Sequence, residues 1–163
     1  MAFELEGRTI FPNSRAAFTM KQKNGFTLVE VMLTIVVLGV LLAVAVAAYQ
    51  DYVTRARISE ADSLTVTSKL ALGEACGADR LDSSTNATLG LPVATAFATP
   101  KVVTSITAEG SSATDASITV VLKEFGGVSA GNTLVYKGTC ARASMAWVID
   151  STSTVPAKFR PRI

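Results

Sequence analysis

The side chains that could carry chemistry in this chain of 163 residues are few, and their types exclude most kinds of catalysis. The chain has no histidine, so histidine-based triads and the commonest metal ligand are both excluded. Its carboxylates show no cluster with the spacing of a metal site. The chain has two cysteines, Cys76 and Cys140. We therefore expect a protein that is not an enzyme and that needs no cofactor.

These two cysteines predict a disulfide if the part of the chain that carries them is exported to an oxidising compartment. Cys76 and Cys140 lie about 64 residues apart, so the bond would close a long loop. In the chain-entropy model such a bond stabilises the folded state by roughly 2–4 kcal/mol. Two free thiols are the alternative.

One acid, Glu30, stands near the start of a long apolar segment. From Phe26 to Ala48 the only other polar side chains are Thr27 and Thr34. About 20 apolar residues at a helical rise of about 1.5 Å span the hydrocarbon core of a membrane, so residues 26–50 are predicted to form a transmembrane helix. An ionised carboxylate in such a segment is costly unless it is paired, which makes Glu30 a candidate functional residue.

The excess positive charge precedes this segment. Residues 1–25 contain four basic residues, among them Lys21 and Lys23, against two acids, whereas the rest of the chain has equal numbers of each. The positive-inside tendency predicts a cytoplasmic N-terminus and export of the chain beyond the apolar segment. The balanced charge of the exported part gives no reason to expect a nucleic-acid-binding domain.

Helical patterning continues beyond the apolar segment, so a single helix is expected from Phe26 to about Gly73. The sequence has no proline or glycine from Val40 to Leu72, and its apolar residues there fall on one face. A secretory signal cleaved near Ala47-Ala48 is the alternative, although the helical pattern runs past that point.

An α+β fold is expected for the rest of the chain. Residues 78–100 are rich in small polar residues and proline and are expected to form a loop. Four β-branched segments, 101–109, 116–125, 132–138 and 144–150, predict a four-stranded antiparallel sheet that covers the amphipathic half of the helix. Phe125, Tyr136 and Trp147 are expected to pack in the core or on the sheet.

Two surface features have open interpretations. The tail carries Lys158, Arg160 and Arg162 and is expected to be solvated, with contact to DNA, an anionic cell surface or a neighbouring subunit as the alternative. Asn86 starts an Asn-Ala-Thr sequence that matches a glycosylation acceptor.

The N-terminal third carries a specific motif. The sequence "KNGFTLVEVMLTIVVLGVLLAVAVAAYQDYVTRARISEA" resembles the N-terminus of type IV pilins of the type IVa class over about forty residues without a gap. The motif is a basic leader ending in glycine, then Phe-Thr-Leu-x-Glu, then an apolar helix ending in Ala-Tyr-Gln-Asp-Tyr. The tail "VPAKFRPRI" is similar, more weakly, to the family's Lys-aromatic-x-Pro segment.

The resemblance implies a processing site. Residues 1–25 would be a cytoplasmic leader, removed by the prepilin peptidase between Gly25 and Phe26, and the new amine of Phe26 would be N-methylated. Glu30 would pair with the N-terminal amine of a neighbouring subunit during assembly, while a contact with Phe26 of the same helix, four residues earlier, is the alternative.

The resemblance also implies an architecture and a location. Residues 26–50 would form the membrane-spanning or filament-core half of the helix, and residues 51–163 the head, with a loop at about 78–100, a sheet at about 101–150 and a tail. The prepilin would wait in the inner membrane with its head in the periplasm. Assembly machinery, with minor pilins, would then build it into an extracellular homopolymer.

Three features depart from the family pattern. Ala47 stands where the family usually has a proline, so local unwinding of the helix is not expected there. The cysteines are not placed to close the family's usual C-terminal loop, because Ile149 stands about where the first of that pair would be. Residues 1–19 lengthen the leader, and a start at Met20 would give one of ordinary length.

The function expected from these features is that of a structural subunit of a type IV pilus, used for adhesion, twitching motility or DNA uptake. A minor pilin or a type II secretion pseudopilin is the alternative, since both share the motif. A monomeric membrane-anchored binding module is a third alternative.

Overall fold

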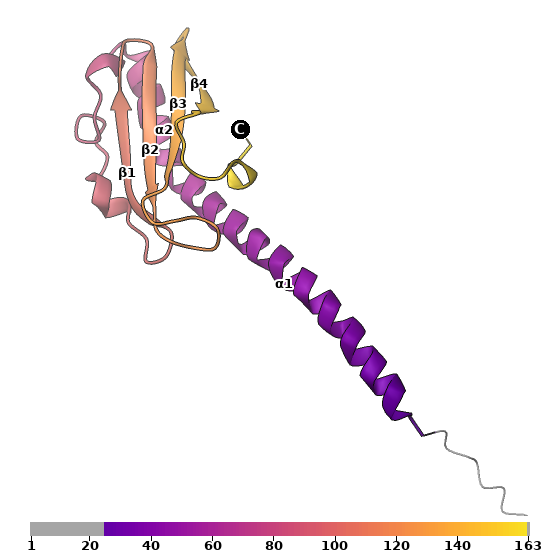
Figure 1. The fold of residues 1–163 in the computed structure, drawn as a ribbon. Helices are drawn as coiled ribbons and strands as arrows, with labels where there is room; N and C mark the ends of the chain where they lie inside the picture. The colour runs from indigo at the N-terminus through magenta and orange to yellow at the C-terminus, as the bar shows by residue number, and fades with distance from the viewer. Residues whose placement is uncertain (1–24, 163) are drawn as a thin grey trace, which may run out of the picture. The chain divides into compact units, whose positions relative to one another are not determined.

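The computed structural model describes residues 25–162, so Lys21 and Lys23 of the expected leader, and both candidate start positions, lie outside the described residues. The described chain forms two units, one up to Gly39 and one from Val40 onward. Along the chain, two helices come first and four strands follow, as labelled in Figure 1.

The predicted long helix is present but is interrupted once. Helix α1 spans Leu28–Leu64 and α2 spans Val66–Gly77, with Thr65 between them. The hydroxyl of Thr65 donates a hydrogen bond of 2.7 Å to the carbonyl of Asp62, and its backbone N–H donates one of 2.9 Å to the same oxygen. These three-residue bonds tighten the turn and interrupt the regular α-helical ladder.

The predicted helix ends are wrong by a few residues. The helix begins at Leu28, two residues after Phe26, and continues past Gly73 to Gly77. Gly73 is tolerated inside α2, and the last turn continues because Ala75 and Cys76 bury their side chains in the head. Tertiary packing thus extends the helix beyond the residue at which propensity alone predicts its end.

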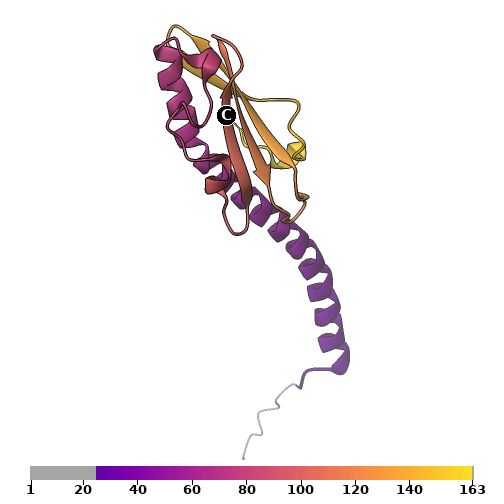
Figure 2. The same cartoon turned by 90° about the vertical axis from the view of Figure 1, so that its left-hand side faces the viewer.

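The predicted α+β fold with a four-stranded antiparallel sheet is confirmed. The strands are β1 (Val103–Gly110), β2 (Asp115–Leu122), β3 (Thr133–Ala141) and β4 (Ser144–Ile149), and each pairs with its neighbour in sequence order. In the unit that begins at Val40, the second half of α1 and all of α2 lie along one face of this sheet (Figure 2).

Strand β3 is longer than predicted, and Cys140 lies inside it rather than in a loop. The turn to β4 is made by Arg142 and Ala143, both with positive φ, 51° and 61°. Two consecutive positive φ angles are typical of a tight type I′ hairpin turn, which usually carries Asn or Gly. Because neither residue type is present, turn propensity does not predict so tight a hairpin here.

The core lies between the sheet and the helices. Along β2 every second side chain is buried, which confirms the predicted alternation of Ile118, Val120 and Leu122. These side chains belong to one buried cluster with Ile58 of α1 and Leu72 of α2. The amphipathic half of the helix therefore supplies the second wall of the head's core.

The loop between α2 and β1 is ordered by its own short elements and by Asn86. It contains the 3-10 helices η1 (Leu81–Ser83) and η2 (Ala94–Phe97). The side-chain amide of Asn86 donates to the carbonyls of Pro92 and Ile106, and its oxygen accepts a 2.7 Å bond from the N–H of Ala108. Asn86 thus fastens the loop to β1, and a glycan on its amide would disrupt these bonds.

Candidate assembly site

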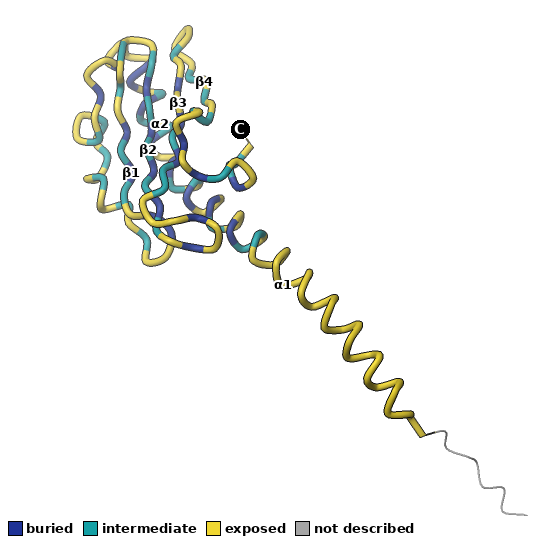
Figure 3. The backbone as a smooth tube through the Cα atoms, viewed as in Figure 1, coloured by how far each residue is buried: buried dark blue, intermediate teal, exposed yellow. Residues whose placement is uncertain are grey.

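The apolar half of α1 is exposed along its length. Phe26 is 78% exposed, and the large apolar residues after it are similarly uncovered (Figure 3). The exposed set is Leu28, Val29, Val31, Met32, Leu33, Ile35, Val36, Val37, Leu38, Val40, Leu41, Leu42, Val44, Val46, Tyr49 and Tyr52. By length and composition this helix can cross a membrane. A water-soluble monomer would not expose so much apolar surface, so the segment requires a lipid or protein partner.

The N-terminal end of α1 is built around Thr27 and Glu30. The hydroxyl of Thr27 accepts a 3.3 Å hydrogen bond from the N–H of Glu30, so Thr27 caps the helix. Thr27 and Glu30 have the spacing of a capping box, and the Glu30 carboxylate lies in the first turn, where the helix dipole favours a negative charge. Sequence reasoning missed this local role, although the Thr-x-x-Glu pattern could have shown it.

The segment where the type IVa pattern has a proline is regularly helical here. Ala47 and Gly39 both lie inside α1, which is uninterrupted from Leu28 to Leu64. The expectation that Ala47 keeps the helix intact is therefore confirmed for the single chain. No atom approaches within 4 Å of a Cβ built on Gly39, so nothing in the described part of the subunit demands a glycine there.

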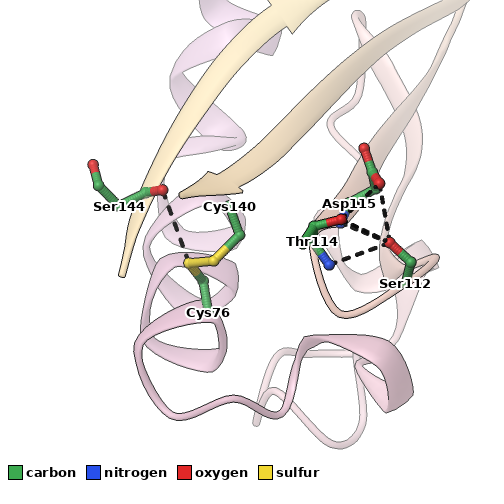
Figure 4. The surroundings of a disulfide bond; sticks show 6 residues. All are labelled: Cys76, Ser112, Thr114, Asp115, Cys140 and Ser144. Carbon is green, nitrogen blue, oxygen red and sulfur yellow. Dashed lines mark hydrogen bonds between the residues drawn. A yellow bond between two sulfur atoms is a disulfide. The ribbon is translucent and has the colours of Figure 1, made fainter. Parts of the chain in front are cut away.

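The two cysteines are joined. Cys76, near the end of α2, forms a disulfide with Cys140 of β3, with 5.9 Å between their Cα atoms (Figure 4). The backbone N–H of Cys140 also donates a 2.6 Å hydrogen bond to Thr114, in the turn between β1 and β2. The covalent bond thus ties the far end of the helix to the end of strand β3 instead of closing a C-terminal loop.

A polar junction joins the helices to the sheet at the interruption. The hydroxyl of Tyr136 donates a 2.7 Å hydrogen bond to Oδ1 of Asp62, and Nζ of Lys69 lies 3.0 Å from the same oxygen. Nζ of Lys69 also lies 4.2 Å from the centre of the Tyr136 ring. Burial first, and then the neighbouring Asp62 carboxylate, raise the pKa of the Tyr136 hydroxyl well above its usual range.

The three aromatic residues expected to pack do so. Tyr136 is fully buried and Phe125 nearly so. Trp147 is partly buried and lies against Gly138 on the neighbouring strand, where an added Cβ would come within 2.7 Å of its ring. A glycine beneath an aromatic ring lets the ring cover the sheet surface, so these residues serve packing.

The expectation that the C-terminal tail is solvated holds for the exposed side chains of Lys158 and Arg162 but not for the segment as a whole. Phe159, in the 3-10 helix η3 (Ala157–Phe159), is only 3% exposed. Nζ of Lys158 lies 3.0 and 3.1 Å from the two carboxylate oxygens of Asp51 on α1. The guanidinium of Arg160 donates to the carbonyls of Ser153 and Val155. The buried Phe159 ring and the ion pair from Lys158 to Asp51 hold the tail in place, while the bonds of Arg160 stay within the C-terminal segment.

Comparison with known proteins identifies the chain's family. A model of the prokaryotic N-terminal methylation motif matches residues 20–46, and a model of pilin, the bacterial filament protein, matches residues 54–162. The chain belongs to the pilin family. It is accordingly a structural pilus subunit and not an enzyme.

Individual relatives agree with this assignment. The chain is 36% identical over 142 residues to the fimbrial protein EcpC of Eikenella corrodens, an alignment that covers 85% of this pilin and 88% of that protein. It is 50% identical over 52 residues to the type IV major pilin protein PilE1 of Neisseria gonorrhoeae, but this covers only 32% of each chain. A fimbrial protein of Moraxella nonliquefaciens is 51% identical over 45 residues, which cover 28% of this chain and 29% of that protein.

The family accounts for the exposed helix. The methylation motif and the pilin assignment imply processing by a prepilin peptidase and self-assembly into filaments. An apolar helix behind such a motif suits a membrane-anchored precursor of an extracellular pilus.

Proposed function

We propose that this pilin is the main subunit of a type IV pilus, made as an inner-membrane prepilin with its head in the periplasm. The observation that carries the proposal is the exposed apolar half of α1, with Glu30 in its first turn. Such a surface can be covered by lipid before assembly and by neighbouring helices afterwards. Because lipid is as apolar as the helices, extraction into the filament requires the pilus assembly machinery.

Processing would occur between Gly25 and Phe26. Both residues precede α1, which begins at Leu28, and no other part of the described chain approaches a Cβ built on Gly25 within 4 Å. An exposed segment outside the helix is the form of chain that a peptidase can bind. Removal of residues 1–25 would create an amine on Phe26, which N-methylation would leave positively charged.

Glu30 would then set the register of assembly. In a packed apolar filament core, the carboxylate of Glu30 would pair with the Phe26 amine of a neighbouring subunit. Removing one partner of a buried ion pair typically costs about 3–5 kcal/mol, because the other charge remains without a partner. A subunit inserted out of register would bear the same cost, so one charge pair can select the correct position.

Beyond self-assembly, the subunit would contact minor pilins and serve adhesion, twitching motility or DNA uptake. A second candidate is a minor pilin or a type II secretion pseudopilin. The observation that favours it is the disulfide from α2 to β3, which differs from the C-terminal loop bridge usual in type IVa pilins. Abundance in the filament distinguishes the two candidates.

Intact-mass spectrometry of filaments sheared from the cell surface tests the proposal. We expect a dominant species that begins at methylated Phe26 and is two hydrogens lighter than the reduced chain because of the disulfide. A processed chain that is abundant in the membrane but absent from sheared filaments would favour the minor pilin. An uncut leader would rule out both candidates.

A matched pair of variants tests the role of Glu30. Glu30→Gln should be processed normally but should abolish surface filaments, because the amine of the neighbour would lose its partner. Glu60→Gln removes the same charge from an exposed site of the head part of α1 and should leave filaments unchanged. Normal piliation by Glu30→Gln would show that Glu30 acts only within its own helix.

A further inference from the structure

A basic cluster lies where the C-terminal tail meets α1. Arg55 and Ser59 of the helix and Lys158, Arg160 and Arg162 of the tail line a surface hollow of about 220 Å³. Phe159 of the tail also lines this hollow, and its side chain is buried. The tail is therefore fixed against the helix, so its basic residues form one surface with Arg55.

The positive charge of this basic cluster is largely uncompensated. Within residues 25–162, the only carboxylate in ion-pair contact with the basic cluster is Asp51, which pairs with Lys158. Arg160 donates to two backbone carbonyls, which carry no formal charge. Arg55 and Arg162 are exposed. The cluster thus presents about three more positive than negative charges to an anionic ligand.

The place of the basic cluster along the helix indicates which anion it meets. Arg55 lies seven positions after Ala48, the last residue of the apolar segment, or about 10 Å along the helix axis. The headgroup layer of a bilayer begins where the hydrocarbon ends and is about 5–8 Å thick on each side. A long arginine side chain can reach back across this distance.

Two tyrosines mark the same level. Tyr49 and Tyr52 lie between Ala48 and Arg55 and are 68% and 70% exposed. Packing within the described residues therefore does not explain why two tyrosines stand here. Exposed tyrosines directly after an apolar helix are typical of the membrane–water interface, where the ring is apolar and the hydroxyl is hydrated.

We propose that the basic cluster of Arg55, Lys158, Arg160 and Arg162 binds the phosphate groups of anionic phospholipids at the outer surface of the membrane that holds the unassembled pilin. The inference rests on the proposed membrane-anchored precursor. The bound phosphates hold the tail side of the head against the membrane until the subunit is extracted. Juxtamembrane basic residues strengthen attachment to anionic lipids, and the effect decreases with ionic strength.

Lipid selectivity of the full chain reconstituted in phosphatidylcholine vesicles tests the inference. Electron paramagnetic resonance measures how much spin-labelled phosphatidylglycerol, compared with spin-labelled phosphatidylcholine, is immobilised by the protein. At low salt we expect a preference for phosphatidylglycerol of about threefold or more, decreasing as salt is raised. Equal immobilisation of the two lipids would overturn the inference.

The double variant Arg55→Gln with Arg162→Gln should lower this preference by at least half, while the basic leader and the remaining cluster residues keep part of it. Both residues are exposed, and neither side chain donates a hydrogen bond within the described chain, so folding should be retained. The matched control, Lys101→Gln with Arg142→Gln, removes the same charge from exposed positions in the sheet half of the head and should keep the preference. An equal loss in both double variants would point to net charge and contradict a localised site.

Two competitors distinguish lipid from other phosphate sources. At equal ionic strength, inorganic phosphate at millimolar concentration should reduce the preference no more than sodium chloride does, and a larger reduction would assign the basic cluster to free phosphate instead. A short duplex DNA that displaced phosphatidylglycerol both from the parent and from the Lys101→Gln with Arg142→Gln control, which keeps the basic cluster, would assign the cluster to nucleic acid. Either result would overturn the lipid assignment.

Failure of the lipid inference can be distinguished from failure of the proposed function. If sheared filaments contain the processed chain but no lipid preference exists, only the lipid inference fails. If alkaline carbonate extracts the precursor from cell membranes, the membrane-anchored precursor fails and the inference fails with it.

Discussion

The hydroxyl of Tyr136 donates a hydrogen bond of 2.7 Å to Asp62, three residues before the helix is interrupted at Thr65. The same Asp62 oxygen also contacts Lys69, which lies on the other side of the interruption. A single carboxylate therefore links α1, α2 and β3. The interrupted helix is held in place by the sheet at the point where its own hydrogen-bond ladder is weakest.

Because of this junction, we expect the stability of the head to decrease at alkaline pH. Burial and Asp62 raise the pKa of Tyr136 in the folded state, whereas in the unfolded chain it ionises near pH 10. The stabilisation from its neutral hydroxyl is complete below about pH 10 and is lost as the pH rises above that value. Tyr136→Phe should cost about 1 kcal/mol at neutral pH and should flatten this alkaline decline.

Thermal unfolding of the full chain in detergent micelles, followed by near-ultraviolet circular dichroism, measures both effects. The parent and Tyr136→Phe should differ near neutrality and converge as the pH rises, since lysine ionisation is common to both. Parallel curves from about pH 8 to pH 11 would contradict the role given to Tyr136.

The interruption at Thr65 also shows what the sequence could not predict. Periodicity correctly indicated helix on both sides, because the apolar face is continuous from Ile58 to Leu72. The break depends on a hydrogen bond from the hydroxyl of Thr65 to the carbonyl of Asp62. Threonine side chains form such bonds in some helices and not in others, so the sequence does not predict it. The hairpin at Arg142 and Ala143 was missed for a similar reason, since tertiary pairing of β3 with β4 imposes two left-handed residues.

The tail shows the opposite limit. Its basic residues predict a solvated segment, but the ring of Phe159 enters the core and fixes the tail to the head. Charge patterns describe how a segment can be hydrated, whereas one buried aromatic side chain can outweigh that hydration. The N-terminal features were more predictable, because an uninterrupted apolar segment with one acid depends on no distant contact.

The disulfide should be one of the main stabilising elements in the head. It joins positions 64 residues apart in sequence, so its removal should lower stability by roughly 2–5 kcal/mol. Cys76→Ser with Cys140→Ser should therefore lower the thermal midpoint by several degrees and reduce the steady-state amount of the subunit. Unchanged midpoints for this variant and the parent, both measured without reductant, would contradict the prediction.

Gly126 should be intolerant of a side chain because the loop between β2 and β3 touches α1 there. A Cβ at this position would overlap Oγ1 of Thr54, and the backbone has a φ of 53°. Gly126→Ala should destabilise the head through both effects. Gly131→Ala is the matched control, since Gly131 has a φ of 82° but no atom within 4 Å of its added Cβ.

Chemical denaturation monitored by the fluorescence of Trp147 compares the two glycine variants. Backbone strain alone should cost about 1–2 kcal/mol in each. The steric overlap should add about 1–3 kcal/mol in Gly126→Ala alone. Equal losses would mean that the loop moves away from Thr54 at no cost.

The attachment of the tail to α1 should depend on the buried ring far more than on the ion pair. Phe159 is nearly fully buried, and its truncation to alanine should cost about 3–5 kcal/mol. The pair between Lys158 and Asp51 is half exposed, so Lys158→Gln should cost no more than about 1 kcal/mol. Limited proteolysis of the tail, read by mass spectrometry, should release residues after Val155 rapidly in Phe159→Ala and at the parental rate in Lys158→Gln. Rapid release in Lys158→Gln would show that the ion pair, rather than the ring, secures the tail.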